Sequence, residues 1–355
     1  MITIYPAEII KTDTGVRLQA PFKMNNMENV LWYEVEEKYG DFLTTERADA
    51  FVVGLLWLAI KKVQNIEVVA PISERLYFTL NNYLIPVLSK QYGKKTIKIR
   101  CSELAGQPVG NTGAVGTGLS CGIDSFSTIC DHLHSEFQNY NITHFTFFNV
   151  GSHGGKRAQK LFTRRANNSR ACANELGKEL ITIDSNISKV LRMRFESTHT
   201  LRSMSAVLTL QKLFNVYYYA SYAPLDYFHM DKRNPAYFDP FTLNMLSTES
   251  LHLFSSGVNR TRFEKTRMVA HYEPSYKYLN VCVKSAKNCS KCWKCLRTLL
   301  SLEIIGKLDN YGSIFNLNRY YKERARYISK VLEKSSSDIF LKEIHDEMVR
   351  TNFKK

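Results

Sequence analysis

The sequence predicts an α/β fold, in which a largely parallel sheet is covered by helices on both faces. Three observations predict it. The chain has 355 residues, 44% of them hydrophobic, enough for one large domain or two of ordinary size. From residue 114 onward, short apolar strands alternate with helical segments, which is the pattern of a parallel sheet. The Gly-rich stretch ELAGQPVGNTGAVGTG reads as a linker before that alternation.

Residues 1–108 are predicted to form an α+β domain of their own. The segments 29–37 and 95–101 have strand character, whereas 47–62 and 72–93 have helical spacing. The apolar run within 47–62 is about half as long as a membrane span, so we expect a buried helix there. No catalytic cluster occurs in this part. We expect scaffolding, with recognition of a substrate or partner, such as a protein or peptide, as the alternative.

Residues 109–355 are predicted to form the parallel-sheet domain. Strands are expected at 114–120, 143–150, 179–184 and 215–222, with helices at 124–134, 156–177 and 199–214 between them. Ligands of such sheets bind at the carboxyl ends of the strands. The candidates there are residues 120–125, Asn149 to His153, Asp184 and Ser221. After residue 224 the pattern becomes irregular, and two amphipathic helices are predicted within 320–350.

The charge of the chain favours an anionic partner or a dispersed basic surface. The 48 Lys and Arg residues against 33 Asp and Glu give a net charge of +15. Such a charge suits a nucleotide, RNA or an acidic surface, but the basic residues form no long run. No basic region followed by an apolar stretch marks a secretory signal at residues 1–15. We therefore expect a soluble cytoplasmic protein.

The stretch TGLSCGIDSFSTICDH, residues 117–132, lies at a predicted turn from strand to helix. Free N–H groups at a helix N-terminus attract anions, and Gly122 permits a sharp turn. Ser120 and Ser125 offer hydroxyls to phosphate oxygens. Asp124 is placed either to cap the helix or to hold Mg²⁺. The Walker and dinucleotide-binding glycine motifs are absent. An ordinary capped helix is the alternative.

Four of the eight cysteines fall within fourteen residues. Cys282, Cys289, Cys292 and Cys295 have the spacing C-x6-C-x2-C-x2-C, and four thiolates complete a tetrahedral zinc site. This clustering favours a metal in a reducing compartment over disulfides. An iron–sulfur cluster, free thiols and a catalytic thiol remain as alternatives.

These motifs together resemble the QueC-like family, the 7-cyano-7-deazaguanine synthases, among the PP-loop ATP pyrophosphatases. The resemblance covers about residues 113–305. The segment 120–125 is similar to the SGGxDS signature, with Cys121 where the family has Gly. The stretch TFFNVGSHGGKRA resembles the family's strand ending in FDYGQRH, with Asn149 in place of the acidic residue. The late cysteine cluster followed by Arg297 also matches.

The resemblance implies a HUP-like fold and an enzyme that uses ATP and Mg²⁺ to adenylate a carboxylate or amide. Pyrophosphate leaves, and ammonia or another nucleophile then displaces AMP. The substrate is expected to be a deazaguanine or a peptide or protein, although the family's substrate-binding motifs have no clear counterpart here. The residues it assigns to ATP are Ser120, Cys121, Gly122, Ile123, Asp124, Ser125, Asn149, Gly151 and His153.

For the substrate side, the stretch SGVNRTRFEKTR is the main candidate. Arg260, Arg262 and Lys265 suit a carboxylate or phosphate, and the alternative is a helix with a basic solvated face. We therefore assign catalytic roles to Asp124, Ser125, Arg260 and Lys265.

Weaker candidates lie in three other places. His199 and Arg202, at a helix start, are placed to reach the nucleotide or to act as cap residues. Ser247 to Glu249 read as substrate contacts or a capping box. Asp184 suits ribose, Mg²⁺ or a turn.

Two other functions remain open at this point. RNA modification by the same adenylation chemistry is supported by the basic charge. A nucleotide-binding module that has lost catalysis would follow if Cys121 impairs the loop. A homodimer is compatible with either.

Overall fold

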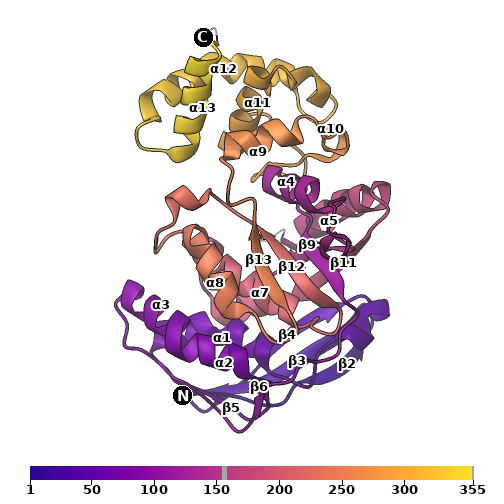
Figure 1. The fold of residues 1–355 in the computed structure, drawn as a ribbon, viewed down its shortest axis with the longest axis vertical. Helices are drawn as coiled ribbons and strands as arrows, with labels where there is room; N and C mark the ends of the chain where they lie inside the picture. Colours follow the sequence, from indigo (N-terminus) through magenta and orange to yellow (C-terminus); the bar gives the residue numbers. More distant parts are fainter. Residues whose placement is uncertain (154–157, 354–355) are drawn as a thin grey trace.

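The computed structural model describes residues 1–153 and 158–353. In these residues eleven strands form one sheet, in the order β13-β12-β9-β10-β11-β4-β3-β1-β5-β7, with β2 paired to β3 (Figure 1). Five neighbouring strands run parallel to one another. They are β13 (His252–Ser256), β12 (Phe214–Ala220), β9 (Ala114–Gly118), β10 (His144–Asn149) and β11 (Glu179–Ser185). The predicted α/β fold with a mostly parallel sheet is confirmed.

Helices cover both faces of this parallel part. Helices α4 (Ile123–His132) and α5 (Ala158–Glu175) cover one face, whereas α1 (Asp49–Lys62) and α7 (His199–Leu208) cover the other. Alternate residues of β12 face opposite ways, since Val216 and Tyr218 join one core and Tyr217 joins the other. The start predicted for α5, at Lys156, lies outside the described residues.

The first hundred residues extend the same sheet. Strand β4 (Met27–Val35) pairs antiparallel with β11, with Glu34 opposite Asp184. Beyond it lie β3 (Gly15–Met24), β2 (Glu8–Thr12), β1 (Ile2–Ile4), β5 (Ile66–Val68) and β7 (Ile99–Cys101). The predicted helix 72–93 consists of α2 (Glu74–Thr79), a π-helical turn (Leu80–Leu84) and α3 (Ile85–Tyr92). The predicted linker at 103–118 therefore connects two parts of one sheet.

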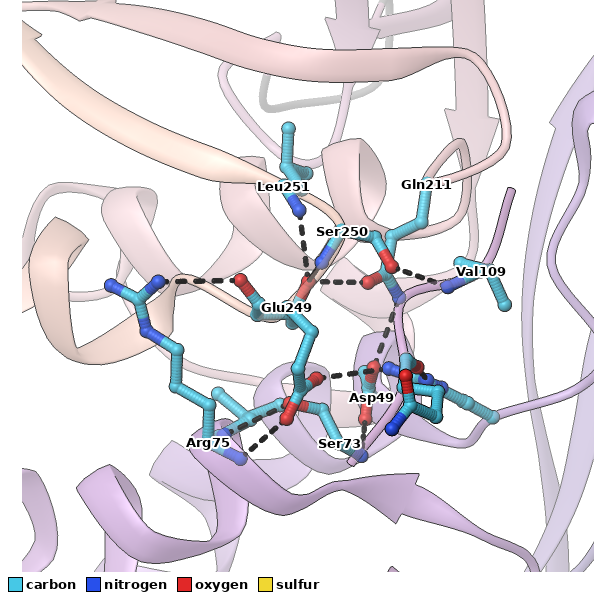
Figure 2. Close-up of polar contacts among 12 residues, drawn as sticks. Asp49, Ser73, Arg75, Val109, Gln211, Glu249, Ser250 and Leu251 are labelled. Carbon is cyan, nitrogen blue, oxygen red and sulfur yellow. Dashed lines mark hydrogen bonds and ion pairs between the residues drawn. The ribbon is translucent and has the colours of Figure 1, made fainter. Parts of the chain in front are cut away.

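A buried polar network holds these two parts together (Figure 2). The carboxylate of Asp49 accepts from Ser73 N–H at 2.9 Å and from Gln211 Nε2 at 3.0 Å. Gln211 Oε1 in turn accepts from the Thr248 hydroxyl at 2.6 Å. Glu249 binds Arg47 and the backbone of residue 75. Each carboxylate oxygen has a donor, so the network is complete without a ligand.

The predicted capping box at residues 247–249 is wrong. Ser247 ends α8 (Asp239–Leu246), and the strand β13 follows instead of a helix. The hydroxyl of Thr248 and the carboxylate of Glu249 belong to the polar network, so their role is to join residues 1–108 to the sheet. A capping box does occur nearby, between Thr261 and Glu264, at the start of α9 (Arg262–Val269).

A group of helices follows β13 and lies at the end of the molecule opposite residues 1–108 (Figure 1). They are α9 (Arg262–Val269), α10 (Pro274–Tyr278), α11 (Trp293–Ile305), α12 (Leu317–Lys334) and α13 (Ile339–Arg350). The last two match the predicted amphipathic pair. Minor elements are α6 (Ile187–Leu191) and the pair β6 (Ile72–Ser73) and β8 (Leu104–Ala105). Among the helices described, none has the length and apolar character needed to cross a membrane.

Candidate functional site

A tight turn joins β9 to α4 where the sequence predicts a phosphate-binding loop. Cys121 has a φ of 56°, in the left-handed region, and Gly122 is extended just before the helix. Ser120 is exposed, and its Oγ accepts from Gly122 N–H at 3.3 Å. The side chain of Ile123 is buried, which leaves only its backbone for a ligand. The first N–H groups of α4 have no partner within the helix, so they are donors suited to phosphate.

The Cys121 side chain points into the core. It is fully buried, and its Sγ lies 3.7 Å from the Ser169 Oγ of α5. Its carbonyl oxygen accepts from Asn280 N–H at 2.7 Å. The backbone at 121 thus adopts the conformation that glycine favours, although the residue is cysteine. The thiol lies in the core and away from the exposed side of the turn.

Asp124 is the centre of an ion-pair cluster. Its Oδ2 lies 2.7 Å from Arg262 Nη2, and its Oδ1 lies 3.7 Å from Lys265 Nζ. That Oδ1 is buried without a hydrogen-bond partner among the described residues. Lys265 is 1% exposed and donates to both oxygens of Ser221, at 2.7 Å each. The capping box that starts α9 places Arg262 and Lys265 three residues apart on one helix face.

Two more cations from α11 join this cluster. Lys294 and Arg297 interact electrostatically with Arg262 and Asp124. Burial, and then the charges of Arg262 and Arg297, lower the pKa of Lys294 to about 8. Burial also lowers the pKa of Lys265 to about 8, although Asp124 opposes that shift. Glu343 of α13 is 8% exposed and also interacts with Arg262, Arg297 and Lys265. Four cations therefore meet two carboxylates, and the site has an excess of positive charge.

Two residues predicted to be catalytic have protein partners. The Ser125 hydroxyl is buried and donates to the Gly118 carbonyl at 2.8 Å, so it braces the turn. Arg260 binds both carboxylate oxygens of Asp131, at 2.9 and 2.7 Å. Asp131 lies two turns along α4 from Asp124. Arg260 therefore does not join the Asp124 cluster, whereas Lys265 does.

In the segment after β10, the predicted ATP-binding residues contact other protein groups or are buried, unlike the exposed turn at 120–125. Asn149 donates to Asp184 Oδ1 at 2.8 Å, across the ends of neighbouring strands. Gly151 has a φ of 115°, and a Cβ there would lie 2.4 Å from Arg202 Nη1. His153 is buried beside Phe162, and burial lowers its pKa to about 4. Residues 154–157 of the same motif lie outside the described residues.

His199 and Arg202 of α7 are engaged with the protein. Arg202 is 1% exposed and donates to the Val150 carbonyl at 3.0 Å and to Ser188 Oγ at 2.7 Å. The ring of His199 is within 2.9 Å of the Tyr219 hydroxyl, and burial lowers its pKa to about 4. Arg202 therefore fixes the loop after β10 by contacting its backbone.

The four predicted metal ligands form one cluster. The Sγ atoms of Cys282, Cys289, Cys292 and Cys295 all lie within 4.8 Å of one another. Zinc–sulfur bonds of 2.3 Å in a tetrahedron require sulfur atoms about 3.8 Å apart. The separations of 3.5 and 4.0 Å around Cys292 are close to that value. These four cysteines can hold a metal such as zinc.

The backbone around the cysteines also suits a metal. Ser290 has a φ of 58°, which turns the chain so that Cys292 N–H approaches Cys289 Sγ at 3.3 Å. Burial raises the pKa of the Cys282 and Cys295 thiols. It also acts on Cys289, but there the N–H groups of Lys291 and Cys292 outweigh it and lower the pKa to about 7. Thiolate is the form that binds metal. Arg165 of α5 donates to the Cys282 carbonyl at 2.7 Å and fixes this segment to the core.

The cysteine segment supports the turn at 120–125. Asn280, two residues before Cys282, supplies the N–H that binds the Cys121 carbonyl. Cys292 and Cys295 begin α11, the helix that also carries Lys294 and Arg297. A metal bound by the four cysteines would therefore help to position the backbone of Cys121, through Asn280. It would also help to position Lys294 and Arg297, through α11.

Comparison with known proteins gave no relative. The chain matches no family model, and neither a curated protein nor a solved structure is significantly similar to it.

The sequence analysis did not single out Lys294, and it named Arg297 only as the residue that follows the cysteine cluster. A signal was present, because the two residues are three apart in a helix that starts at the third cysteine. What the sequence does not contain is the packing of α11 against α9, which brings them to Asp124. That contact is tertiary.

Proposed function

We propose that this chain is an enzyme that cleaves ATP to AMP and pyrophosphate in order to adenylate a carboxylate or amide. The observation that carries the proposal is the excess of buried positive charge around Asp124. Buried cations are costly unless anions pair with them, and the cluster leaves Arg262, Lys265, Lys294 and Arg297 with too few. A triphosphate would supply those anions.

The arrangement suits loss of pyrophosphate in particular. Donors at a helix N-terminus and fixed cations stabilise the negative charge that develops on a leaving phosphate group. The Oδ1 of Asp124, which has no hydrogen-bond partner among the described residues, is available to Mg²⁺, which would neutralise further charge on the phosphates. An acyl adenylate would then react with ammonia, so that a C–N bond forms and the C–O bond to AMP breaks. The resemblance of residues 120–125 to the PP-loop signature supports the same reading.

The test is to identify the products from ATP labelled at the α-phosphate. With candidate acids and ammonia, we expect labelled AMP together with pyrophosphate. Lys265→Met should lower the rate at least 100-fold, as loss of a preorganised charge does in other enzymes. Lys277→Met is the matched control, because Lys277 also pairs with a carboxylate, that of Glu175, but on the exposed surface. Circular dichroism of both variants monitors the fold. Labelled ADP as the product would overturn the proposal.

A second candidate, RNA modification by the same chemistry, is favoured by one surface feature. Lys291, Arg326 and Lys330 surround Trp293 in a pocket of about 250 Å³, and the Trp293 side chain is 49% exposed. Cations beside an exposed aromatic ring suit phosphates and a stacked base. A gel shift with tRNA at two salt concentrations tests it, since phosphate contacts weaken steeply as salt rises. Unchanged migration at low salt would remove this candidate.

A further inference from the structure

A second pocket, of about 660 Å³, lies beside α4 at the edge of the parallel sheet. Its floor contains Tyr218 of β12 and Phe254 of β13, which are direct neighbours in the strand pairing. The ring of His132, at the end of α4, stacks on Tyr218 with centroids 3.8 Å apart and an angle of 7° between the planes. The segment from Ser135 to Tyr140 forms another wall. The volume is typical of a small-molecule site.

Three aromatic side chains of this pocket are exposed, whereas Tyr218 is buried. Phe137 is 64% exposed, Tyr140 is 49% exposed and Phe254 is 47% exposed. All three line the same cavity, although they come from two separate segments of the chain. Scattered exposed rings need no explanation, but a concave cluster of them marks a binding site.

Polar groups at the rim could recognise the edge of a bound ring. His132 Nε2 and Ser256 Oγ are 3.0 Å apart, and the Asp131–Arg260 pair lies on the same side. Burial lowers the pKa of His132, although Asp131 opposes the shift, so its imidazole is neutral at neutral pH. A neutral imidazole both stacks and exchanges hydrogen bonds. Aromatic faces with a polar rim suit a heteroaromatic ring better than an aliphatic chain.

Two structural connections link the pocket to the turn at 120–125 (the phosphate turn): helix α4, and the contact between Ser221 and Ser256 at the ends of β12 and β13. Asp124 and Asp131 are seven residues apart, so they share one face of α4 at a separation of about 10 Å. The Ser256 carbonyl, at the pocket, accepts from Ser221 N–H at 2.8 Å, and Ser221 also binds Lys265. A ring in the pocket would thus lie within the reach of one nucleotide-sized molecule from the phosphate turn.

We propose that this pocket binds the planar heteroaromatic ring of a small molecule used in the reaction. The inference rests on the proposed function, because the ring belongs either to ATP itself or to the acceptor that ATP activates. Phe137, Phe254 and the His132–Tyr218 stack hold its faces, and the Ser256 and Arg260 side of the rim meets its polar edge.

The test measures binding of adenosine, guanosine and ATP to the full chain by calorimetry. The double variant F137L/F254L keeps apolar volume but removes two ring faces, and both positions are exposed enough to leave the fold intact. We expect it to weaken nucleoside binding at least tenfold. Phe78→Leu is the matched control, since Phe78 is 53% exposed and contacts Tyr83 within residues 1–108. It should change nothing.

The outcomes separate the sources of the ring. Weaker binding of ATP together with adenosine in F137L/F254L places the ring of ATP in the pocket. Unchanged ATP binding with weaker nucleoside binding places an acceptor ring there. The inference is overturned if neither nucleoside binds at millimolar concentration, or if F137L/F254L binds them as well as the natural chain does. Failure of ATP binding alone, in the natural chain, would instead count against the proposed function.

Discussion

Two carboxylates, Asp49 and Asp124, show how a structural polar cluster differs from a candidate active site. Asp49 is fully buried, and both of its oxygens accept hydrogen bonds, from Ser73 and Gln211 (Figure 2). Asp124 has one oxygen paired with Arg262 and one with no hydrogen-bond partner among the described residues. The first cluster is complete, and the second has charge and hydrogen-bonding capacity left for a ligand.

The two carboxylates also differ in their position in the fold. Asp49 is the first residue of α1, and its partners come from strand β6 (Ser73) and from the turn after α7 (Gln211). Asp124 lies at a helix N-terminus at the carboxyl ends of parallel strands, where an open α/β sheet binds ligands. Asp49 is fully buried with all its hydrogen bonds made, whereas the Asp124 side chain is 26% exposed and has one oxygen without a hydrogen-bond partner among the described residues.

Loss of the metal that the four cysteines are expected to hold should have the largest effect on the cluster around Asp124. Chelation, or Cys292→Ser, should release one zinc ion per chain and lower the free energy of unfolding by about 3 kcal/mol or more. Formation of AMP should be lost with it, because Asn280 and α11 no longer hold the turn. Zinc analysis, thermal unfolding and product assays measure these effects. Cys101→Ser, a cysteine outside the cluster, is the control. Full zinc content after Cys292→Ser would contradict the assignment.

Asp124→Asn should remove most of the activity while leaving the chain folded. We expect AMP formation to fall about 100-fold or more, since the charge facing Mg²⁺ and the cations is removed. The free energy of unfolding should also fall, by about 1–3 kcal/mol, because Arg262 and Lys265 lose the carboxylate that pairs with them. Product assays and denaturant unfolding of the same samples decide it. A large loss of stability with normal turnover would make Asp124 a structural residue like Asp49.

Asp49→Asn should instead preserve the activity. One of its two donors would then face an amide N–H, so the free energy of unfolding should fall by about 1–3 kcal/mol. AMP formation should remain within about twofold of the natural rate, as Asp49 belongs to the complete network. Unfolding in denaturant and the product assay measure the two quantities. Lost turnover at unchanged stability would show that the network reaches the site.

The same variant gives a pH dependence with a defined sign. Burial raises the pKa of Asp49 to about 6, from 3.8. The folded chain therefore binds the proton more tightly than the unfolded chain, and ionisation destabilises the fold. The stability of the natural chain relative to Asp49→Asn should fall as the pH rises from about 4 to 6, by about 3 kcal/mol. A relative stability that is flat over this range would contradict the shift.

Cys121→Gly has the smallest expected effect. Glycine removes the strain of a cysteine in the left-handed backbone conformation, which costs about 1 kcal/mol. It also removes a buried thiol, whose burial stabilises the fold by a similar amount. The free energy of unfolding should change by less than about 1 kcal/mol, and turnover should persist. Denaturant unfolding and the product assay check both. Activity that appears only in the glycine variant would identify the natural chain as one that has lost catalysis.

The parts of the fold predicted from the sequence are those with a strong local pattern. The strands and helices between 114 and 222 were found because each is a short apolar or helical run. Strand β3 was missed although Val16, Leu18, Ala20 and Phe22 alternate inward, which is a readable signal. Its pairing, and the extension of the sheet through β4, depend on contacts distant in the chain.

The candidate site divides in the same way. The turn at 120–125 and the four cysteines have characteristic spacing, so both were predicted. Arg260 and Lys265 looked equivalent in the sequence, but the start of α9 at Arg262 directs them to different carboxylates, Asp131 and Asp124. The pocket beside Tyr218 has no sequence signal, because its walls meet only in three dimensions.

The antiparallel pairing of β4 with β11 has a consequence for how the chain can be divided. A chain that began at residue 109 would leave the backbone of β11 open along one side and would uncover the face of α7 that α1 now buries. An open strand edge next to exposed apolar surface promotes self-association. The first hundred residues are therefore structurally inseparable from residues 109–355, and swapping them between proteins would require the receiving sheet to offer a matching strand.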